Sequence, residues 1–310
     1  MNARVPIAIA CGLAAALCNL APQSGFPGGL MLSLVTSLPL FYAGLTQSWL
    51  WALVAGLVAT GVMLAFGGGW MALIFLAATA MPVIVLVRQA LLAQPLQDGG
   101  LIWYPVDRLA WWLGGIGLLF GLGVFMVMET GPFRETVDQV FQAVFATAEM
   151  SETDLARFQE MFRRIIPPVF AGSTMLLLVF NGALAQWIAR RSGRAVRAEL
   201  PLAGLRLPMA AAVALAAASL GSAVIPGDAG LLLAIAAAVL STLFVLQGLA
   251  VAHRLIGSRT GGGGGLAIFY VVALIMLFGL TPLVILMLML LGVADCFLDL
   301  RRRNTSGTGT

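Results

Sequence analysis

Charged side chains are almost absent from long stretches of this chain, and that pattern decides the solvent in which it can fold. Eight apolar runs approach the roughly 20 residues that a helix needs to cross a bilayer. These runs cover residues 5–21, 30–45, 49–66, 70–93, 110–128, 168–189, 209–225 and 231–252. Charged residues make up 10% of the chain, against about a quarter in soluble domains. We therefore predict an all-α, polytopic transmembrane helical bundle that forms one integral membrane domain over residues 1–310, with the lipid bilayer as its solvent.

The last apolar stretch, residues 266–298, allows two interpretations. One straight helix would be about 50 Å long, too long for a hydrocarbon core of about 30 Å, and residues 279–282 offer a break. A hairpin gives ten segments and places thirteen of the 17 arginines on the cytoplasmic side, whereas one kinked helix gives nine segments and places ten there. The excess of arginine in cytoplasmic loops favours the hairpin. We expect eight to ten segments, both termini in the cytoplasm, and residues 301–310 as a disordered cytoplasmic tail.

Residues 129–167 form the one sizeable segment between the apolar runs. The segment carries seven acidic and four basic residues, which favours the extracytoplasmic side. Apolar residues recur with a helical period over residues 133–148 and again over 155–166, and Ser151 with Asp154 forms a capping signature between them. We expect an extracytoplasmic insertion of two amphipathic helices that lies on the membrane surface, caps the bundle or acts as a lid over a substrate path.

The chain offers few groups for catalysis. His253 is the single histidine and stands beside Arg254 at the end of a run, and no cluster of His or Cys accompanies it to build a metal site or a triad. The glycine run 261–265 lacks the Lys and the Ser or Thr of a phosphate-binding loop, so an ATP-driven role would require a separate ATPase subunit. We expect no enzyme, metal site or cofactor. The arginines sit beside apolar runs and not on a basic face interleaved with aromatic residues, so we expect no nucleic-acid partner.

Polar residues within the apolar runs are the candidate site residues. Asn181 lies midway along the sixth run, Gln186 follows on the same run, and Thr281 lies at the break of the last stretch. An intramembrane Asn serves either as an interhelical hydrogen bond or as a ligand contact, and both uses stay open here. Asp295 is the one acidic residue inside an apolar stretch. We expect it to pair with Arg301 or to reach the cytoplasmic interface.

Small residues recur at helical spacing in the first run. Ala10 and Ala14 form an A-x-x-x-A pair, and Gly12 and Ala16 form a second pair on a neighbouring face. Such faces let two helix backbones approach closely. The first run therefore offers two faces on which a helix could pack.

Short motifs are spread along nearly the whole chain. They are Leu38-Pro39-Leu40 with Gly44 and Leu45, the glycines 67–69, Ala80-Met81-Pro82, Trp103-Tyr104-Pro105 with Arg108, and Gly292, Asp295 and the arginines 301–303. Together they resemble the YybS-like bacterial membrane proteins, a domain family of unknown function. That family is more distantly similar to the substrate-capturing subunits of energy-coupling-factor vitamin transporters.

The distant resemblance has one consequence for particular residues. In those transporter subunits a first-helix A-x-x-x-A face docks on a transmembrane coupling protein, which implies that Ala10 and Ala14 face a partner helix. Those subunits typically have six helices, whereas this chain is expected to have eight to ten and an external insertion.

Two functions fit these observations. The first is a small-molecule binding or transport component of the bacterial inner (cytoplasmic) membrane, in which Asn181, Gln186 and Thr281 bind the substrate and a separate ATPase or coupling subunit is the partner. The alternative is a non-transporting scaffold of the cell envelope that holds a partner through its amphipathic helices. The resemblance and the scarcity of catalytic groups favour the first.

Overall fold

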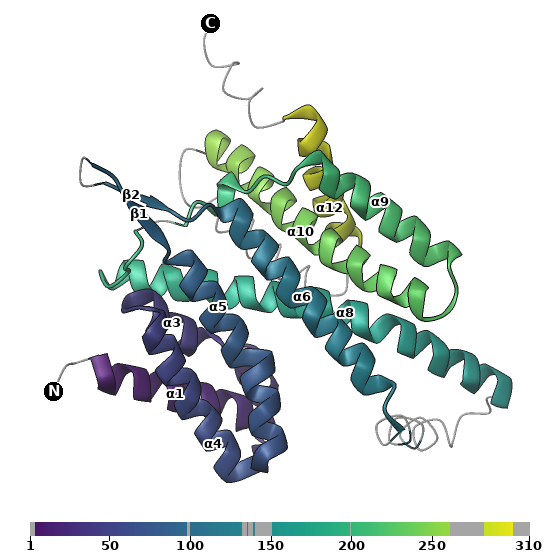
Figure 1. Cartoon of the computed structure of the whole chain (residues 1–310), viewed down its shortest axis with the longest axis horizontal. Coiled ribbons are helices and arrows are strands. Elements are labelled where there is room, and N and C mark those ends of the chain that lie inside the picture. Colours follow the sequence, from purple (N-terminus) through teal and green to yellow (C-terminus); the bar gives the residue numbers. More distant parts are fainter. Residues whose placement is uncertain are drawn as a thin grey trace, which may run out of the picture. The chain divides into compact units, whose positions relative to one another are not determined.

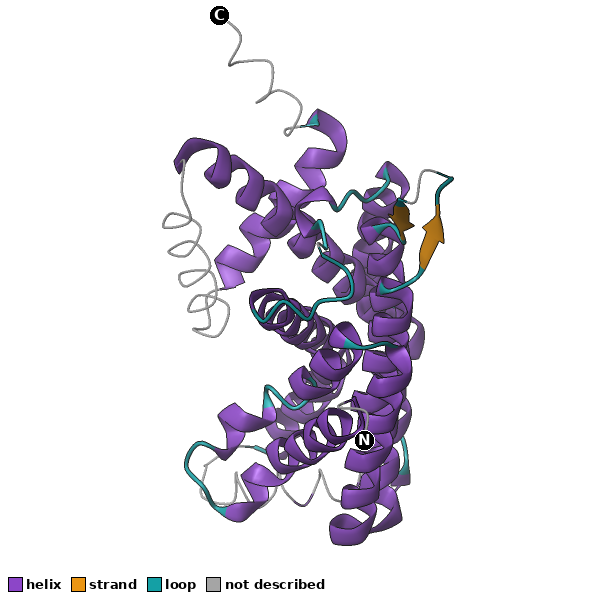
Figure 2. Cartoon of the chain, turned by 90° about the vertical axis from the view of Figure 1, so that its left-hand side faces the viewer, coloured by secondary structure: helices purple, strands orange, loops and turns teal. Residues whose placement is uncertain are grey.

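A computed structural model of the chain describes residues 4–97, 100–131, 151–198, 200–260 and 282–299, together with the single positions 135 and 139. Nearly all of these residues lie in helices, and one short two-stranded ribbon interrupts them (Figure 2). Within this part of the chain, six helical stretches are long and apolar enough to cross a membrane. The prediction of an all-α chain with membrane-length helices is confirmed at that level.

Residues 4–90 form a series of closely spaced helices. Helix α1 is followed by a 3-10 turn η1, a short α2 leads after a four-residue break into α3, and α4 continues through the π-helical turn η2 into α5 (Figure 1). Their bounds are Arg4–Leu20 for α1, Ala21–Ser24 for η1, Gly29–Ser33 for α2, Leu38–Thr46 for α3, Trp49–Phe75 for α4, Leu76–Ala80 for η2 and Met81–Ala90 for α5.

An antiparallel ribbon of β1 and β2 follows, in which Gln94 pairs with Ile102. Longer helices follow. Their bounds are Ala93–Pro95 for β1, Leu101–Trp103 for β2, Val106–Met128 for α6, Glu152–Arg191 for α8, Leu202–Gly204 for the 3-10 turn η3, Met209–Val224 for α9, Gly227–Thr260 for α10 and Pro282–Leu298 for α12. The ribbon was not predicted from the sequence.

Gly68 turns the long stretch Trp49–Ala90 back on itself. This stretch has 42 residues, about 63 Å as a straight helix and twice the thickness of a hydrocarbon core. Gly68 adopts φ 76° and ψ −178°, a backbone conformation that L side chains rarely tolerate. Beyond Gly68 the chain runs back beside the first part of α4. The close approach of Gly56 and Ala80 shows this, since a Cβ on Gly56 would lie 3.2 Å from the Cβ of Ala80. The turn predicted at residues 67–69 is present.

Helix α8 begins where the sequence places a cap. The Ser151 hydroxyl accepts a hydrogen bond from the Asp154 backbone N–H at 3.2 Å and donates one to Asp154 Oδ2 at 2.7 Å. The helix then continues through Pro167 and Pro168 without ending. The amphipathic segment 155–166 and the apolar run 168–189 are therefore one continuous helix. The other amphipathic segment, residues 133–148, falls almost wholly outside the described residues.

The chain packs as two compact units. Unit 1 contains residues 1–113 and 176–201, and unit 2 contains residues 114–175 and 202–310. Helices α6 and α8 contribute one part to each unit. In unit 1, α1 packs on α4, where Gly12 lies directly against Val58 and the neighbouring Ala8, Ala15 and Ala55 are fully buried. Small side chains thus allow a close helix approach.

Unit 2 is also held by glycine contacts. Gly117 and Gly121 of α6 lie against Met175 and Ala171 of α8, and Gly121 also meets Ile235 of α10. Helix α10 additionally packs on α9 and α12 (Figure 1). The G-x-x-x-G spacing of Gly117 and Gly121 is a sequence signal for close packing.

Candidate functional site

Nine polar or charged side chains are buried in the described part of the chain. They are Thr36, Ser37, Gln89, Asn181, Gln186, Arg197, Thr242, Gln247 and Asp295. A buried polar group in an apolar surrounding needs a hydrogen-bond partner. The partners of these residues therefore show what each one does.

The most connected of them is Gln247 on α10, which is 1% exposed. Its Oε1 accepts a hydrogen bond from the backbone N–H of Leu207 at 2.8 Å. Its Nε2 lies 3.1 Å from the carbonyl oxygen of Gly292 and 3.1 Å from Oδ2 of Asp295, both on α12. The Cys296 thiol lies 3.5 Å from the same Nε2 and donates to the carbonyl of Leu207 at 3.2 Å. We call Leu207, Gln247, Gly292, Asp295 and Cys296 the Gln247 cluster.

Two glycines explain why Gln247 reaches α12. A Cβ on Gly248 would overlap the carbonyl oxygen of Leu288, and a Cβ on Gly292 would overlap the carbonyl oxygen of Phe244. The backbones of α10 and α12 are therefore in direct contact at this crossing. A side chain at either glycine would move the helices apart and break the cluster.

Asp295 is a carboxylate buried within an apolar helix of unit 2. It is 6% exposed and accepts a hydrogen bond from Gln247, whereas the sequence led us to expect pairing with Arg301 or a position at the interface. Arg301 lies outside the described residues. One turn further along, Asp299 forms an ion pair of 3.1 Å with Arg206. A buried acid in an apolar helix is a candidate functional group, which makes Asp295 the strongest candidate residue.

Asn181 closes a broken helix in unit 1. It is fully buried, and its Nδ2 donates to the carbonyl oxygens of Leu34 at 2.9 Å and Leu177 at 2.8 Å. Leu34 follows α2, and the helical donor for its carbonyl would be the N–H of Leu38, which bonds to Val35 instead. Asn181 thus gives the Leu34 carbonyl the donor that the helix break removes. This is the interhelical hydrogen bond that the sequence analysis left as one of two uses. Its Oδ1 is buried without a partner in the described structure.

Gln186 and Arg197 form a second polar link in unit 1. Gln186 Nε2 donates to the Arg197 carbonyl at 2.7 Å. Arg197 is 3% exposed, and its Nη1 donates to the carbonyls of Ala90 at 2.9 Å and Tyr104 at 3.2 Å. Its guanidinium carbon lies 5.5 Å from the ring centre of Trp103. We call this arrangement the Arg197 clasp.

The clasp joins three segments. Ala90 is the last residue of α5, where the carbonyls lack helical donors and a cation is favourable. Trp103 is the last residue of β2, and Tyr104 follows it. Burial lowers the pKa of the Arg197 guanidinium, which nevertheless remains charged because its ordinary pKa is so high. From the sequence, Arg197 was one of many cytoplasmic arginines, and no sequence signal marked it as buried.

The predicted site residues that the structure describes have separate partners. Asn181 contacts the break after α2, Gln186 contacts the loop after α8, and Thr281 lies outside the described residues. On α1, Ala10 is exposed and Ala14 is half-buried, so this pair is not the face that packs on α4. The neighbouring pair Gly12 and Ala16 is buried.

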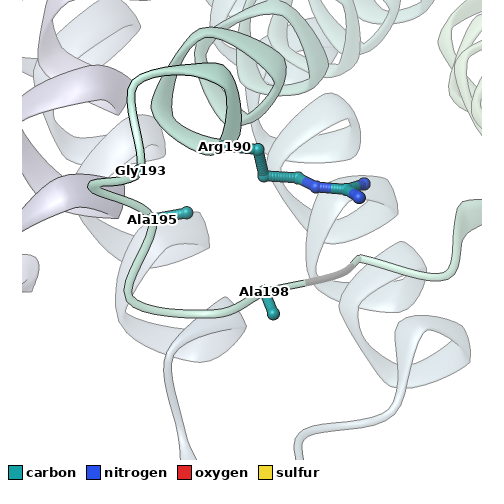
Figure 3. A pocket seen from close by; sticks show the side chains of 4 residues that line it. All are labelled: Arg190, Gly193, Ala195 and Ala198. Atoms are coloured by element: carbon teal, nitrogen blue, oxygen red, sulfur yellow. The ribbon is translucent and has the colours of Figure 1, made fainter.

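Two pockets lie elsewhere in the described structure. One of about 430 Å³ in unit 1 is lined by Arg190, Gly193, Ala195 and Ala198 (Figure 3). A smaller one of about 120 Å³ in unit 2 is lined by Arg164, Ser222, Ile225, Gly227, Gly230, Leu231 and Ala234. Neither pocket is lined by a residue of the Gln247 cluster or by Asn181.

The Gln247 cluster is the arrangement with the clearest chemical capacity. Its carboxylate accepts a hydrogen bond, and its carboxamide both donates and accepts. In the described part of the chain, no group of three or more His, Cys, Asp or Glu residues is placed to hold a metal ion. Comparisons of the chain with protein-family models, with curated proteins and with solved structures found no match.

Proposed function

We propose that the chain is a multi-pass protein of the bacterial inner membrane that acts as a small-molecule binding or transport component. Six membrane-length helical stretches and the shorter apolar helices α9 and α12 support the membrane assignment. The excess of arginine on one side supports eight to ten segments with both termini in the cytoplasm. The resemblance to transporter substrate-capturing subunits favours binding or transport.

One observation carries this function, the burial of Asp295 against Gln247 between α10 and α12. A carboxylate kept in an apolar helix pair costs stability, and acids in such positions often take part in moving or binding a substrate or an ion. A ligand that bonds to the Asp295 carboxylate would compete with Gln247 for it. The pair would thereby couple ligand binding to the packing of α10 on α12.

Transport also needs a source of energy, and the described residues suggest where a partner would attach. The chain has no phosphate-binding loop, so a separate ATPase or coupling subunit would supply ATP hydrolysis. Ala10 is exposed on α1, next to Ile9 and Leu13, which are 41% and 45% exposed. This outer face of α1 is our candidate docking face for the coupling subunit.

The proposal is tested with the full chain purified in lipid nanodiscs. Thermal unfolding is recorded against a library of vitamins and other metabolites for the wild type, for Asp295→Asn and for the control Asp228→Asn. Asp228 is exposed in the first turn of α10. We expect a ligand that raises the Tm of the wild type and of the control but not of Asp295→Asn. The proposal fails if no ligand stabilises the wild type and no ATPase or coupling subunit co-purifies.

A scaffold of the cell envelope is the second candidate, and the start of α8 favours it. Phe158, Met161 and Ile165 are 37%, 47% and 48% exposed at helical spacing on this segment. Deleting residues 133–166 separates the two functions. Loss of a captured partner with uptake intact supports the scaffold, and loss of uptake supports transport.

A further inference from the structure

The ribbon of β1 and β2 in unit 1 has one face that is wholly apolar. Residues that stand opposite each other in an antiparallel pair point to the same side of the ribbon. The pairs of Ala93 with Trp103 and of Pro95 with Leu101 therefore share one face. We call these four residues the apolar ribbon face. The pair between them contains Gln94 and points to the opposite side.

The outer part of the apolar ribbon face is uncovered. Leu101 is 52% exposed, and Pro95 is also exposed. At the base, the guanidinium carbon of Arg197 lies 5.5 Å from the ring centre of Trp103 and partly covers it. A two-stranded ribbon is only marginally stable in water by itself, and strands that face water are commonly protected by charged side chains. The ribbon segment contains one charged residue, Asp98, between the two strands in the sequence. Its composition therefore suits contact with an apolar layer.

The ribbon stands where two membrane-length helical stretches end. Two residues separate Ala90, the end of α5, from β1, and two residues separate β2 from Val106, the start of α6. The stretches Trp49–Ala90 and Val106–Met128 are both long and apolar enough to cross a membrane. Figure 1 shows the ribbon leaving the end of α5. Its base therefore lies at the level at which the chain leaves the hydrocarbon core.

Aromatic residues at the base of the ribbon mark the same level. The indole Nε1 of Trp112 donates to the hydroxyl of Tyr104, which follows β2, at 3.2 Å. In the last turn of α5, the guanidinium carbon of Arg88 lies 6.0 Å from the ring centre of Trp49. Tyr and Trp gather at the boundary between headgroups and acyl chains. The base of the ribbon is therefore placed at that boundary.

Charge complementarity favours an anionic membrane surface at this end of unit 1. Arg88 in α5 and Arg108 in α6 are exposed on either side of the ribbon in the sequence. In the topology proposed above, both lie on the cytoplasmic side. Anionic lipids of the cytoplasmic leaflet attract arginines that lie close to the surface. The two arginines thus hold the base of the ribbon close to the headgroups.

The backbone of the ribbon limits how deep it can lie. Each of its two strands is paired on one edge, and open sheet edges do not occur in the hydrocarbon core because unpaired N–H and C=O groups are costly there. At the boundary, the free edges can bond to headgroups and water while an apolar face meets acyl chains. The ribbon can therefore lie along the membrane surface but cannot cross the membrane.

We propose that the ribbon of β1 and β2 lies in the boundary between headgroups and acyl chains, with Leu101 and Pro95 of the apolar ribbon face in contact with lipid. The ribbon anchors the connection between α5 and α6 to the membrane surface, and the Arg197 clasp fixes its base. This inference rests on the membrane assignment in the proposed function and is independent of the substrate.

The test uses light-induced cross-linking of the full chain in nanodiscs of phosphatidylcholine and phosphatidylglycerol. The photoreactive amino acid benzoylphenylalanine, which inserts into nearby C–H bonds, replaces Leu101 in one protein and Gln94 in a second. The two probes then stand on opposite faces of the same ribbon. A third protein carries the probe in place of Leu119, which is 72% exposed on α6 and reports lipid contact within a span. Mass spectrometry of the peptides measures the yield of lipid adducts.

We expect lipid adducts from positions 101 and 119 and a much lower yield from position 94. Adducts at 119 without adducts at 101 overturn the proposal and leave the membrane assignment intact. Equal yields at 101 and 94 also overturn it, because the ribbon would then have no side that faces lipid. A cross-link from 101 to a second chain in place of lipid shows a protein occupant, and the lipid assignment is then wrong. Absence of adducts at all three positions contradicts the membrane assignment itself.

Hydrogen exchange of the ribbon amides in the same nanodiscs tests the natural side chains. Because Leu101 is half exposed within the chain, Leu101→Asp removes mainly the lipid contact, and we expect exchange about five to ten times faster than in the wild type. Leu101→Phe keeps the apolar surface, and Gln94→Asp adds the same charge to the opposite face. Both should exchange at the wild-type rate. Equal rates in all four proteins overturn the proposal.

Discussion

The carboxamide of Gln247 on α10 donates a hydrogen bond of 3.1 Å to the carboxylate of Asp295 on α12. The same carboxamide accepts the backbone N–H of Leu207, so one side chain links two helices and the segment that precedes α9. Because Gln247 is 1% exposed, water cannot replace these bonds when they are lost. The cluster is therefore a stability element of unit 2.

Replacing Gln247 by Leu should destabilise unit 2. Leucine has a side-chain volume close to that of glutamine but leaves the Leu207 N–H and the Asp295 carboxylate without this partner. We expect the free energy of unfolding to fall by about 2–4 kcal/mol. Thermal unfolding in detergent measures the loss. Gln94→Leu is the control, since Gln94 is exposed on β1, and its Tm should stay close to that of the wild type. Equal Tm values for the two variants would show that the cluster contributes nothing to stability.

The crossing of α10 and α12 should tolerate no side chain. Gly292→Ala places a Cβ onto the carbonyl oxygen of Phe244, so the helices must separate, and we expect a loss of about 1–3 kcal/mol. In Gly115→Ala, on α6, the new Cβ meets nothing within 4 Å. That control should be neutral or stabilised by up to about 1 kcal/mol. Urea or heat unfolding of both variants checks the difference, and a stable Gly292→Ala would mean that the two backbones are not in contact.

Much of the helical organisation could be predicted from the sequence, because apolar run length sets where a chain can cross lipid. The turn at Gly68 and the cap at Ser151 were predictable for local reasons, a glycine run and a capping signature. The ribbon of β1 and β2 was not, because its three-residue strands are too short for an alternating pattern to appear.

The contacts of the buried polar residues could not be predicted in the same way. Whether Asp295 meets Gln247 depends on which helices pack together, and among 36 glycines the sequence does not single out Gly248 and Gly292 as the pair in contact. Asn181 was predictable as a buried polar residue of its span. Its partner Leu34 was not, because the broken helix after α2 became visible only in three dimensions.

Asn181 should act through the helix break in unit 1. Asn181→Leu removes the donor to the Leu34 carbonyl, and we expect a loss of about 1–2 kcal/mol, within the range of interhelical hydrogen bonds in membranes. Unfolding of the variant is compared with that of Asn19→Leu, since Asn19 is half-buried on α1 and should change little. An Asn181→Leu variant as stable as the wild type would instead favour a role for Asn181 in contacting a ligand.

Arg197 should not be replaceable by lysine. Lysine keeps the charge but lacks the planar fork that reaches the carbonyls of Ala90 and Tyr104 and stacks on Trp103, so we expect Arg197→Lys to lose about 1–3 kcal/mol. Arg194→Lys, at an exposed position of the same loop, is the matched control and should lose almost nothing. Limited proteolysis gives a local readout, because an opened clasp exposes the loop 192–198 while the helices stay folded. Faster cleavage in Arg197→Lys than in Arg194→Lys confirms the clasp, and equal cleavage rates with equal Tm values would show that charge alone, and not the geometry of the guanidinium, holds the loop.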